Sequence, residues 1–341
     1  MRSWTRASDT KLGGGLRPTS PSEGASAAPS ETSPRDSIAA AKPPLELRPT
    51  TAPARPAATR PWYIDVWVQM LRRKPLGTAG AVIVLVMLAT AVLANWLTPY
   101  GFAQTSLRER FIAMSGAHWL GTDQLGRDLL TRLMFGARIS LYVGFGAVLL
   151  GSALATAIGV LSAYFGGRLD LWLQRAVDAW MAFPPLLLLL SIMSLLGPSA
   201  LNITVVLGVA FGIQNSRIIR GVALAVREHT YVEGARALGA GHVRTTTAHI
   251  LPNVLPTIIV VATTGLSTVI LTEASLSFLG LGVPPPYPTW GGMLSLAGLD
   301  HMYQAPWLAI WPAVALSLAV FGFNMLGDAL RDLLDPRLRG G

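Results

Sequence analysis

Long apolar runs separated by short polar segments occupy most of the chain beyond residue 76, whereas the first 61 residues contain hardly any large apolar side chain. A helix that crosses the hydrocarbon core of a bilayer needs about 20 apolar residues. Six runs approach this length, at residues 77–97, 141–164, 179–196, 199–215, 254–272 and 307–327. The pattern therefore predicts an all-α membrane protein with six membrane-spanning helices.

Helix-breaking residues interrupt two of these runs. The third contains Pro184 and Pro185 near its start, and the fourth is short and carries Gly208 and Gly212. Such breakers are tolerated where neighbouring helices, and not lipid, surround the backbone. We therefore expect the six helices to pack into a bundle.

The segment before the first run is predicted to have two parts. Residues 1–61 are rich in Pro, Ser, Ala, Thr and Gly and cannot bury enough apolar surface to offset the entropy of ordering them, so we expect a disordered tail. Residues 62–76 carry three aromatic side chains and the basic triplet Arg72, Arg73 and Lys74, which is typical of a cytoplasmic membrane interface. This places the tail and the N-terminus in the cytoplasm.

Basic residues between the runs indicate the orientation in the membrane. The segment between the fourth and fifth runs holds five arginines, whereas residues 273–306 contain neither Lys nor Arg. Because cytoplasmic loops carry the excess of Lys and Arg, we expect that segment in the cytoplasm, and with six crossings the C-terminal residues 329–341 as well. Residues 98–138 are then an extracytoplasmic loop, although their own five arginines conflict with that side.

Composition supports the membrane assignment and excludes several kinds of site. Hydrophobic residues make up 51% of the chain and charged residues only 13%, about half the usual charged share. The net charge of +9 is divided between tail and body without a dense basic patch interleaved with aromatics, so no nucleic-acid partner is expected. The absence of cysteine rules out disulfides, thiol catalysis and thiolate metal sites.

Nucleotide hydrolysis and metal binding are not expected in this chain. A phosphate-binding loop needs Lys followed by Ser or Thr, but Lys11, Lys42 and Lys74 precede Leu or Pro. The five histidines lack the spacing of a helical zinc site, and no reactive constellation of an enzyme is recognisable. The first four predicted spans contain no charged residue of the kind that ion-driven carriers use. A self-sufficient secondary transporter or channel stays the alternative to a subunit driven by ATP hydrolysis on another polypeptide.

The segment 227–253 is the most informative part of the chain. Three arginines recur at helical spacing and predict that the fourth span continues into the cytoplasm with a basic stripe: Arg217, Arg220 and Arg227. The stretch from Tyr231 to Gly239 predicts a short helix ended by glycine, and a second short helix is expected to lead into Leu251 and Pro252. Periodicity alone fits an ordinary surface hairpin and a docking element equally well.

At this segment the chain resembles the membrane subunits of bacterial ABC importers. Their cytoplasmic signature starts with E-A-A, continues through a glycine and ends in I-x-L-P, and it is matched by Glu233, Gly234, Ala235, Gly239, Leu251 and Pro252. Gly234 replaces the middle alanine, and His249 stands where isoleucine is usual. The sequence H-I-L-P-N at 249–253 is similar to the form typical of the dipeptide, oligopeptide and nickel importers.

Further segments resemble the same branch and extend the similarity from about residue 62 to the end of the chain. They are HWLGTDQLGRD at 118–128, followed by Arg132 and GARISL at 136–141, EASLSFLGLG at 273–282, Trp290-Gly291, and GDALRDLLDP at 327–336. Their order is similar to that of the C-type permease of these importers, which pairs with a B-type permease.

The resemblance implies a six-helix type I importer fold in the plasma (inner) membrane, with the permease core at 139–328 and an ATPase-coupling loop at 227–253. Tyr231 and the six signature residues are the expected coupling residues. A B-type permease, ATPase subunits that bind ATP and Mg²⁺, and an extracytoplasmic solute-binding protein are the implied partners, and this chain itself would hold no cofactor. Dipeptides, oligopeptides or related solutes are the implied cargo. Glu273 is expected either to face the pathway and meet a peptide amino group or to form hydrogen bonds to neighbouring backbone groups, and its place at the edge of the fifth span favours the second role.

Overall fold

The computed structural model describes residues 75–295 and 300–334. The predicted disordered tail (1–61), residues 62–74 of the predicted interfacial segment and the C-terminal residues 335–341 lie outside the described residues. Within the described residues the fold is helical, and the only β feature is an isolated bridge between Thr122 and Asp128. This agrees with the predicted all-α class.

The helices follow one another in the order α2 (Pro75–Leu97), η1 (Leu107–Glu109), α3 (Leu129–Phe165), α4 (Gly167–Met181), α5 (Pro185–Leu196), α6 (Ala200–Arg227), α7 (Thr230–Ala237), α8 (His242–Arg244), η2 (Thr245–Ile250), α9 (Leu251–Phe278), α10 (Trp290–Leu294) and α12 (Trp307–Leu334). Five helical stretches in the described part of the chain are long and apolar enough to cross a membrane, and they contain α2, α3, α6, α9 and α12. Each of them covers one of the predicted apolar runs, except that Ser199, the first residue of the fourth run, caps α6 and lies just outside it. Five of the six predicted spans are therefore confirmed as single helices.

The third predicted span is wrong as a single helix. Residues 179–196 are divided between α4 and α5, whose axes meet at 89°. The residue before a proline is pushed out of the α region, and Pro184 accordingly has ψ 123° at the start of α5. The 12 residues of α5 extend only about 18 Å, whereas a bilayer core is about 30 Å thick. A sixth crossing exists only if α4 and α5 together count as one bent span.

The predicted extracytoplasmic loop 98–138 is too long. Its last residues, 129–138, form the first turns of α3. Asp128 starts this helix, because its carboxylate accepts hydrogen bonds from the Thr131 backbone N at 2.8 Å and from the Thr131 hydroxyl at 2.7 Å. The hydropathy pattern missed these turns because Arg132 and Arg138 interrupt the apolar run.

Helix α12 also extends beyond its predicted end. It continues to Leu334 and so includes residues 329–334 of the predicted C-terminal segment. Helix α6 runs to Arg227, which confirms the extension predicted from the arginine spacing. Both differences from the hydropathy runs arise because a helix can continue as a polar helix outside the apolar layer.

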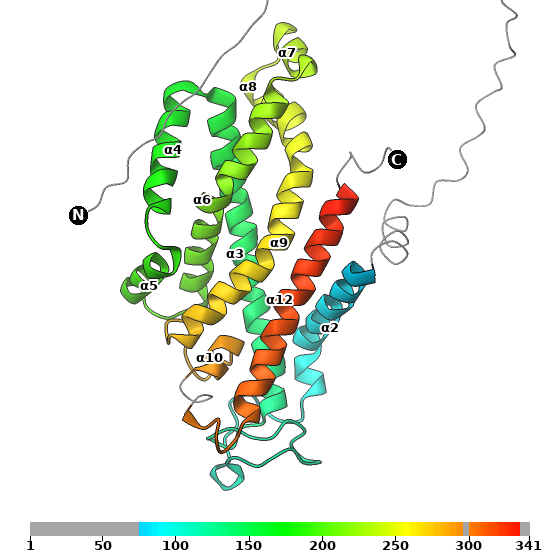
Figure 1. Ribbon diagram of the computed structural model, residues 1–341, viewed down its shortest axis with the longest axis vertical. Helices are drawn as coiled ribbons and strands as arrows, with labels where there is room; N and C mark the ends of the chain where they lie inside the picture. The colour runs from blue at the N-terminus through cyan, green and yellow to red at the C-terminus, as the bar shows by residue number, and fades with distance from the viewer. Residues whose placement is uncertain (1–74, 296–299, 335–341) are drawn as a thin grey trace, which may run out of the picture. The chain divides into compact units, whose positions relative to one another are not determined.

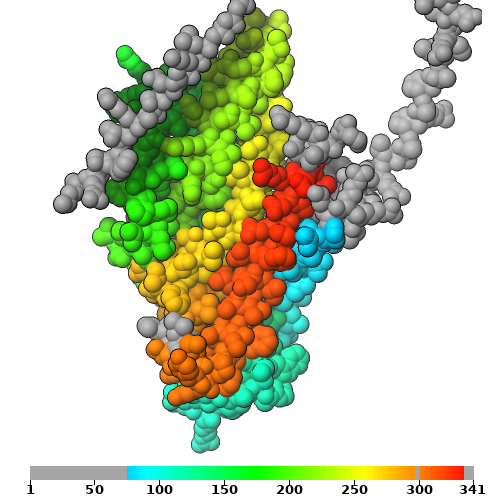
Figure 2. Space-filling view, viewed as in Figure 1, coloured from blue at the N-terminus to red at the C-terminus, as the bar shows by residue number. Residues whose placement is uncertain are grey.

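Helices α3 and α6 pack closely along much of their length. A Cβ on Gly151 of α3 would come within 2.6 Å of the Gly208 carbonyl oxygen of α6, and a Cβ on Gly212 within 2.8 Å of the Gly151 carbonyl oxygen. The glycines therefore allow the two backbones to approach each other, which is how small residues stabilise helix pairs in membranes. Helix α9 packs on both partners and on α12, and α2 packs on α12 and α3. Figure 2 shows α9, α12 and α2 side by side on one face.

The long helices connect two ends of the bundle (Figure 1). Helices α2 and α9 run in one direction, and α3, α6 and α12 run in the other. We call the end that carries α7 and α8 the α7 end, and the end formed by residues 98–128, α10 and residues 300–306 the loop end. The expected coupling residues and the extracytoplasmic loop thus lie at opposite ends.

Candidate functional site

Helix α7 contains the predicted E-A-A segment and ends at the predicted glycine. The Ala240 N–H donates to the Ala235 carbonyl at 3.0 Å, and the Gly239 N–H donates to the Arg236 carbonyl at 2.9 Å. These two bonds form a Schellman cap, which needs a left-handed residue after the helix. Gly239 supplies it with φ +87°. A Cβ at Gly239 would meet no atom within 4 Å, so backbone conformation, and not space within the chain, selects glycine.

The outer face of α7 is open to a partner. Tyr231, Glu233, Gly234 and Leu238 are exposed, and 92% of Leu238 is accessible. Val243, in the short helix that follows, is 78% exposed. Large apolar side chains this exposed at the tip of a polar protrusion are typical of a surface that another protein covers. A carboxylate, Glu233, lies in the first turn, where it interacts favourably with the helix dipole.

The inner face of α7 is anchored to the bundle. Val232 is fully buried, and the Arg236 guanidinium lies 4.9 Å from the centre of the Tyr164 ring at the end of α3. The Tyr164 hydroxyl is 2.8 Å from Nδ1 of His242, which begins α8. The helix is therefore held against α3 and α8 while its outer face stays free.

The second short helix predicted after Gly239 is wrong. Helix α8, the π-helical turn η2 and α9 follow one another without a break, so Leu251 and Pro252 lie in the first turn of a membrane-spanning helix. The π turn has a local cause: Pro252 has no N–H, and its ring cannot approach the carbonyl four residues earlier. The Leu251 N–H accordingly donates to Thr246 O, five residues back. Residues 242–278 therefore form one continuous helical stretch, which begins three residues after Gly239.

The predicted basic stripe on α6 faces other helices of the bundle. Arg220 donates to both carboxylate oxygens of Asp170 in α4, at 2.7 and 2.6 Å. Arg217 pairs with Asp178, which also lies in α4, and Arg227 donates to the Ala163 carbonyl of α3 at 2.8 Å. The stripe therefore holds α4 and α3 against α6, and most of its charge is neutralised within the chain.

Glu273 lies in α9, far from α7. It is fully buried and accepts a hydrogen bond from Ser140 of α3 at 3.2 Å and one from Ser277 at 2.6 Å. Both carboxylate oxygens therefore have partners within the protein, although these are serine hydroxyls and not the backbone groups we expected. The geometry does not bring Glu273 to a surface.

Residues 75–295 and 300–334 contain no group of three or more His, Asp or Glu side chains placed to hold a metal ion. Tyr231, Glu233, Gly234, Ala235 and Gly239 come together on one short helix and its cap, whereas Leu251 and Pro252 lie in the helix that leaves it. The contacts of Arg236 and His242 with Tyr164, which anchor α7 to α3, could not be predicted from the sequence, because no spacing pattern relates the end of α3 to α7.

Two family models and three relatives match the chain. Residues 155–340 match the family "Binding-protein-dependent transport system inner membrane component", and residues 61–113 match the "N-terminal TM domain of oligopeptide transport permease C". The chain is 38% identical to the dipeptide transport system permease protein DppC of Alkalihalophilus pseudofirmus over 301 residues, which cover 88% of this chain and 98% of the relative.

Two glutathione transport system permease proteins named GsiD are similarly related. The protein of Pectobacterium atrosepticum is 40% identical over 283 residues, and that of Escherichia coli is 38% identical over 284 residues. In each case the alignment covers 82% of this chain and 92% of the relative. The chain is therefore a multi-pass membrane protein that belongs to the family of inner-membrane components of binding-protein-dependent (ABC) transport systems, in the branch of the C-type permeases.

Proposed function

We propose that the chain is one of two different permease subunits of an ATP-driven importer of short peptides or related solutes. It is the non-catalytic subunit that forms half of the pathway. A B-type permease forms the other half, ABC ATPase subunits bind ATP and Mg²⁺ at the α7 end, and a solute-binding protein delivers cargo at the loop end. The α7 end and both termini face the cytoplasm.

The observation that carries this proposal is the exposed face of α7. An anchored short helix with Leu238 and Val243 exposed beside Glu233 offers apolar contact and a charge to a groove on a partner. No lysine of the chain is followed by Ser or Thr, so ATP hydrolysis must be supplied by that partner.

The structure offers a route from such a partner to the membrane helices. Closure of the ATPases would displace α7, which is joined to α3 through Arg236 and Tyr164 and to α9 through α8 and η2. Helix α3, with 37 residues, is about 55 Å long and reaches the loop end. Rigid helices moved at one end rotate at the other, which is the kind of motion that alternates access to a pathway.

The names of the relatives support a peptide-like cargo. Their names describe dipeptide and glutathione transport, and glutathione is itself a peptide-like solute. We therefore propose peptides of a few residues as the substrate class.

The test is co-purification of the tagged chain with its partners from mild detergent. We compare wild type with Gly239→Asp and, as the matched control, Gly241→Asp. Both glycines are exposed and neither would place a Cβ within 4 Å of another atom, but only Gly239 has a positive φ. Wild type and Gly241→Asp are expected to retain a second permease and P-loop ATPases, whereas Gly239→Asp keeps the permease and loses the ATPases.

A different result would favour the secondary carrier. If wild type purifies alone and takes up solute in liposomes without ATP, the importer assignment is wrong. Normal recovery of the ATPases with Gly239→Asp would instead show that α7 is not part of the interface with them.

A further inference from the structure

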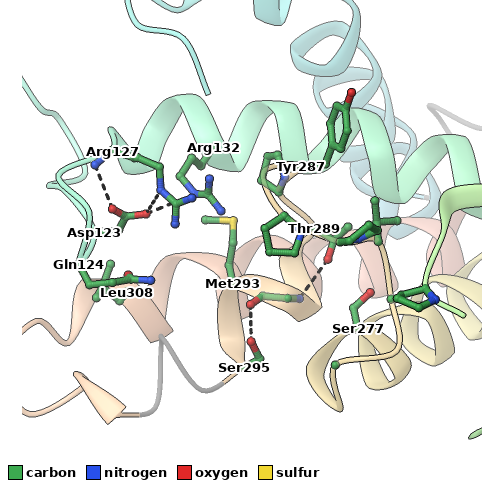
Figure 3. Close-up of a pocket in the computed structure, with 18 of the residues that line it drawn as sticks. Asp123, Gln124, Arg127, Arg132, Ser277, Tyr287, Thr289, Met293, Ser295 and Leu308 are labelled. Carbon is green, nitrogen blue, oxygen red and sulfur yellow. Dashed lines mark hydrogen bonds and ion pairs between the residues drawn. The ribbon is translucent and has the colours of Figure 1, made fainter. Parts of the chain in front are cut away.

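A cleft of about 380 Å³ lies at the loop end between the start of α3, the end of α9 and α10 (Figure 3). Two segments singled out in the sequence, 118–128 with Arg132 and 273–282, meet around it, and coupling at α7 uses neither of them. The residues that matter for its chemistry are Asp123, Arg127, Arg132, Ser277, Thr289 and Met293.

The cleft has an excess of positive charge. Asp123, Arg127 and Arg132 are the charged residues among those that line it. The Asp123 carboxylate accepts from Arg127 Nε at 2.6 Å and lies 3.5 Å from Arg132 Nε. One carboxylate therefore serves two guanidinium groups, which leaves one positive charge without a counter-ion in the cleft.

Several guanidinium nitrogens in the cleft have no partner. Arg127 and Arg132 are only 9% and 8% exposed. Among the described residues, the two terminal nitrogens of Arg127 and Nη2 of Arg132 form no hydrogen bond, while Arg132 Nη1 donates to the Phe102 carbonyl at 3.2 Å. Figure 3 shows the two groups side by side next to Asp123. These nitrogens are not sealed inside the protein but open to the cleft, so an anionic ligand that enters it can accept hydrogen bonds from them.

The other two buried acids of the described residues, Asp128 and Glu273, do not supply the missing charge. Asp128 is 3.0 Å from Nδ1 of His118 and also accepts from Thr131. Glu273 lies behind the wall of the cleft, because Ser277, which lines the cleft, donates its hydroxyl proton to it. Neither carboxylate is among the groups that line the cleft.

The other walls suit the end of a peptide. Leu129, Met293 and Leu308 are buried and line the cleft on an apolar side, where a methionine can adapt to side chains of different shape. The Thr289 hydroxyl accepts from the Gly292 N–H at 3.1 Å and can donate its own proton into the cleft. The volume lies within the range of small-molecule sites, about 300–1,000 Å³.

We propose that this cleft binds the C-terminal carboxylate of the imported peptide, with Arg127 and Arg132 as its donors and Met293 and Leu308 against its last side chain. The inference rests on the proposed function and adds a specificity: free peptide acids are preferred over peptides without a terminal carboxylate. The guanidinium pair would receive the peptide at the loop end, at the start of the helix that α7 moves.

The experiment uses the complete importer with its partner subunits in proteoliposomes. The probes are a pool of random tripeptides with free C-termini and the same pool as C-terminal amides. The initial rate of ATP-dependent uptake is measured below saturation by mass spectrometry, and the acid-to-amide ratio is compared between variants. The binding protein is identical throughout, so its own preference cancels from the comparison.

The variants separate ligand binding from a structural role of the ion pair. Arg127→Gln leaves Asp123 and Arg132 as a balanced pair, and it is expected to lower the acid-to-amide ratio about tenfold through slower uptake of the acids alone. Arg127→Lys retains the positive charge, so its acid-to-amide ratio is expected to stay close to that of wild type. Asp123→Asn removes the competing carboxylate and is expected to raise the ratio. Arg108→Gln removes an exposed charge of the same segment that does not line the cleft, and it should leave the ratio unchanged.

Three outcomes are decisive. An unchanged ratio in Arg127→Gln, or an equal loss of acids and amides, would overturn the carboxylate site. A ratio that falls in both Arg127→Gln and Asp123→Asn would also overturn it. An ion pair with a purely structural role is broken by either substitution, so both variants would then be impaired in the same direction. Failure of the wild-type complex to import either pool would refute the proposed function itself, which is a distinguishable result.

Discussion

The guanidinium group of Arg236 in α7 lies 4.9 Å from the centre of the Tyr164 ring, 72 positions earlier in the chain at the end of α3. The hydroxyl of the same tyrosine is 2.8 Å from Nδ1 of His242. One side chain thus joins the exposed helix to α3 and to the start of the helical stretch that contains α9. This joint holds the eight-residue helix α7 in place although much of its own surface is exposed.

Replacement of Tyr164 by leucine is expected to uncouple α7 from α3. The change removes both the aromatic face and the hydroxyl, and a cation–π contact of this kind is worth about 1 kcal/mol at a partly exposed site. We expect normal membrane insertion but about fivefold slower ATP-dependent uptake by the reconstituted importer.

Tyr164→Phe is the matched control for this joint. It retains the ring under Arg236 and loses only the contact with His242, so its uptake should lie between that of wild type and Tyr164→Leu. Equal uptake by the phenylalanine and leucine variants would show that the aromatic face does not contribute.

Much of the bundle could be predicted from hydropathy, and the misses have definite causes. Apolar runs identified five long helices because lipid demands them. The start of α3 was missed because Asp128 caps a turn that contains Arg132, and hydropathy does not register caps. The bend between α4 and α5 was signalled by Pro184 and Pro185, but its angle depends on how α4 pairs with α6.

The pair of Asp170 and Arg220 is predicted to hold α4 in place. Their two charge-assisted hydrogen bonds are 2.7 and 2.6 Å long and partly shielded from solvent. Arg220→Leu is therefore expected to lower the free energy of unfolding in detergent by about 1.5–3 kcal/mol. Thermal or denaturant unfolding followed by circular dichroism measures the change.

Arg217→Leu provides the comparison for that pair. Arg217 and its partner Asp178 are both close to half exposed, so their pair should contribute less than about 1 kcal/mol. The double variant Asp170→Leu with Arg220→Leu should be more stable than Arg220→Leu, since no charge is left unpaired. Equal effects of Arg217→Leu and Arg220→Leu would contradict this account.

Glu273 is predicted to be a structural residue. Glu273→Ala would strand the hydroxyls of Ser140 and Ser277 in a buried site and should destabilise the protein by about 2 kcal/mol or more. Glu273→Gln keeps the shape and one acceptor, so it should cost less. If Glu273 instead met the peptide amino group, Glu273→Gln would change the relative uptake of free and N-acetylated peptides without affecting stability.

The orientation of the bundle is testable because the chain has no cysteine. Tyr303 at the loop end is 93% exposed, and Val243 at the α7 end is 78% exposed. In intact spheroplasts, a membrane-impermeant maleimide should label Tyr303→Cys, whereas Val243→Cys should react only after permeabilisation. The reverse pattern would place α7 outside and exclude an ATPase there.

The sequence predicted a short helix ended by Gly239, but it did not predict the cleft at the loop end. The motifs around Arg127 and Ser277 were visible, yet about 150 positions separate them, and their meeting depends on α3 packing against α9. The arginines of residues 98–138 conflicted with the predicted orientation. The structure resolves part of that conflict, because Arg127 and Arg132 are buried against Asp123 and are not free surface charges.

The most direct test of the central claim, that α7 docks on an ATPase, is site-directed cross-linking. A benzophenone maleimide is attached to Leu238→Cys on the outer face of α7 or to Tyr303→Cys at the opposite end, and the complex is irradiated in its membrane. The account predicts that Leu238→Cys becomes joined to a polypeptide whose peptides include a G-x-x-x-x-G-K-[S/T] loop, while Tyr303→Cys does not. Cross-linking of Leu238→Cys to lipid alone, in a complex that still imports peptide, would contradict it.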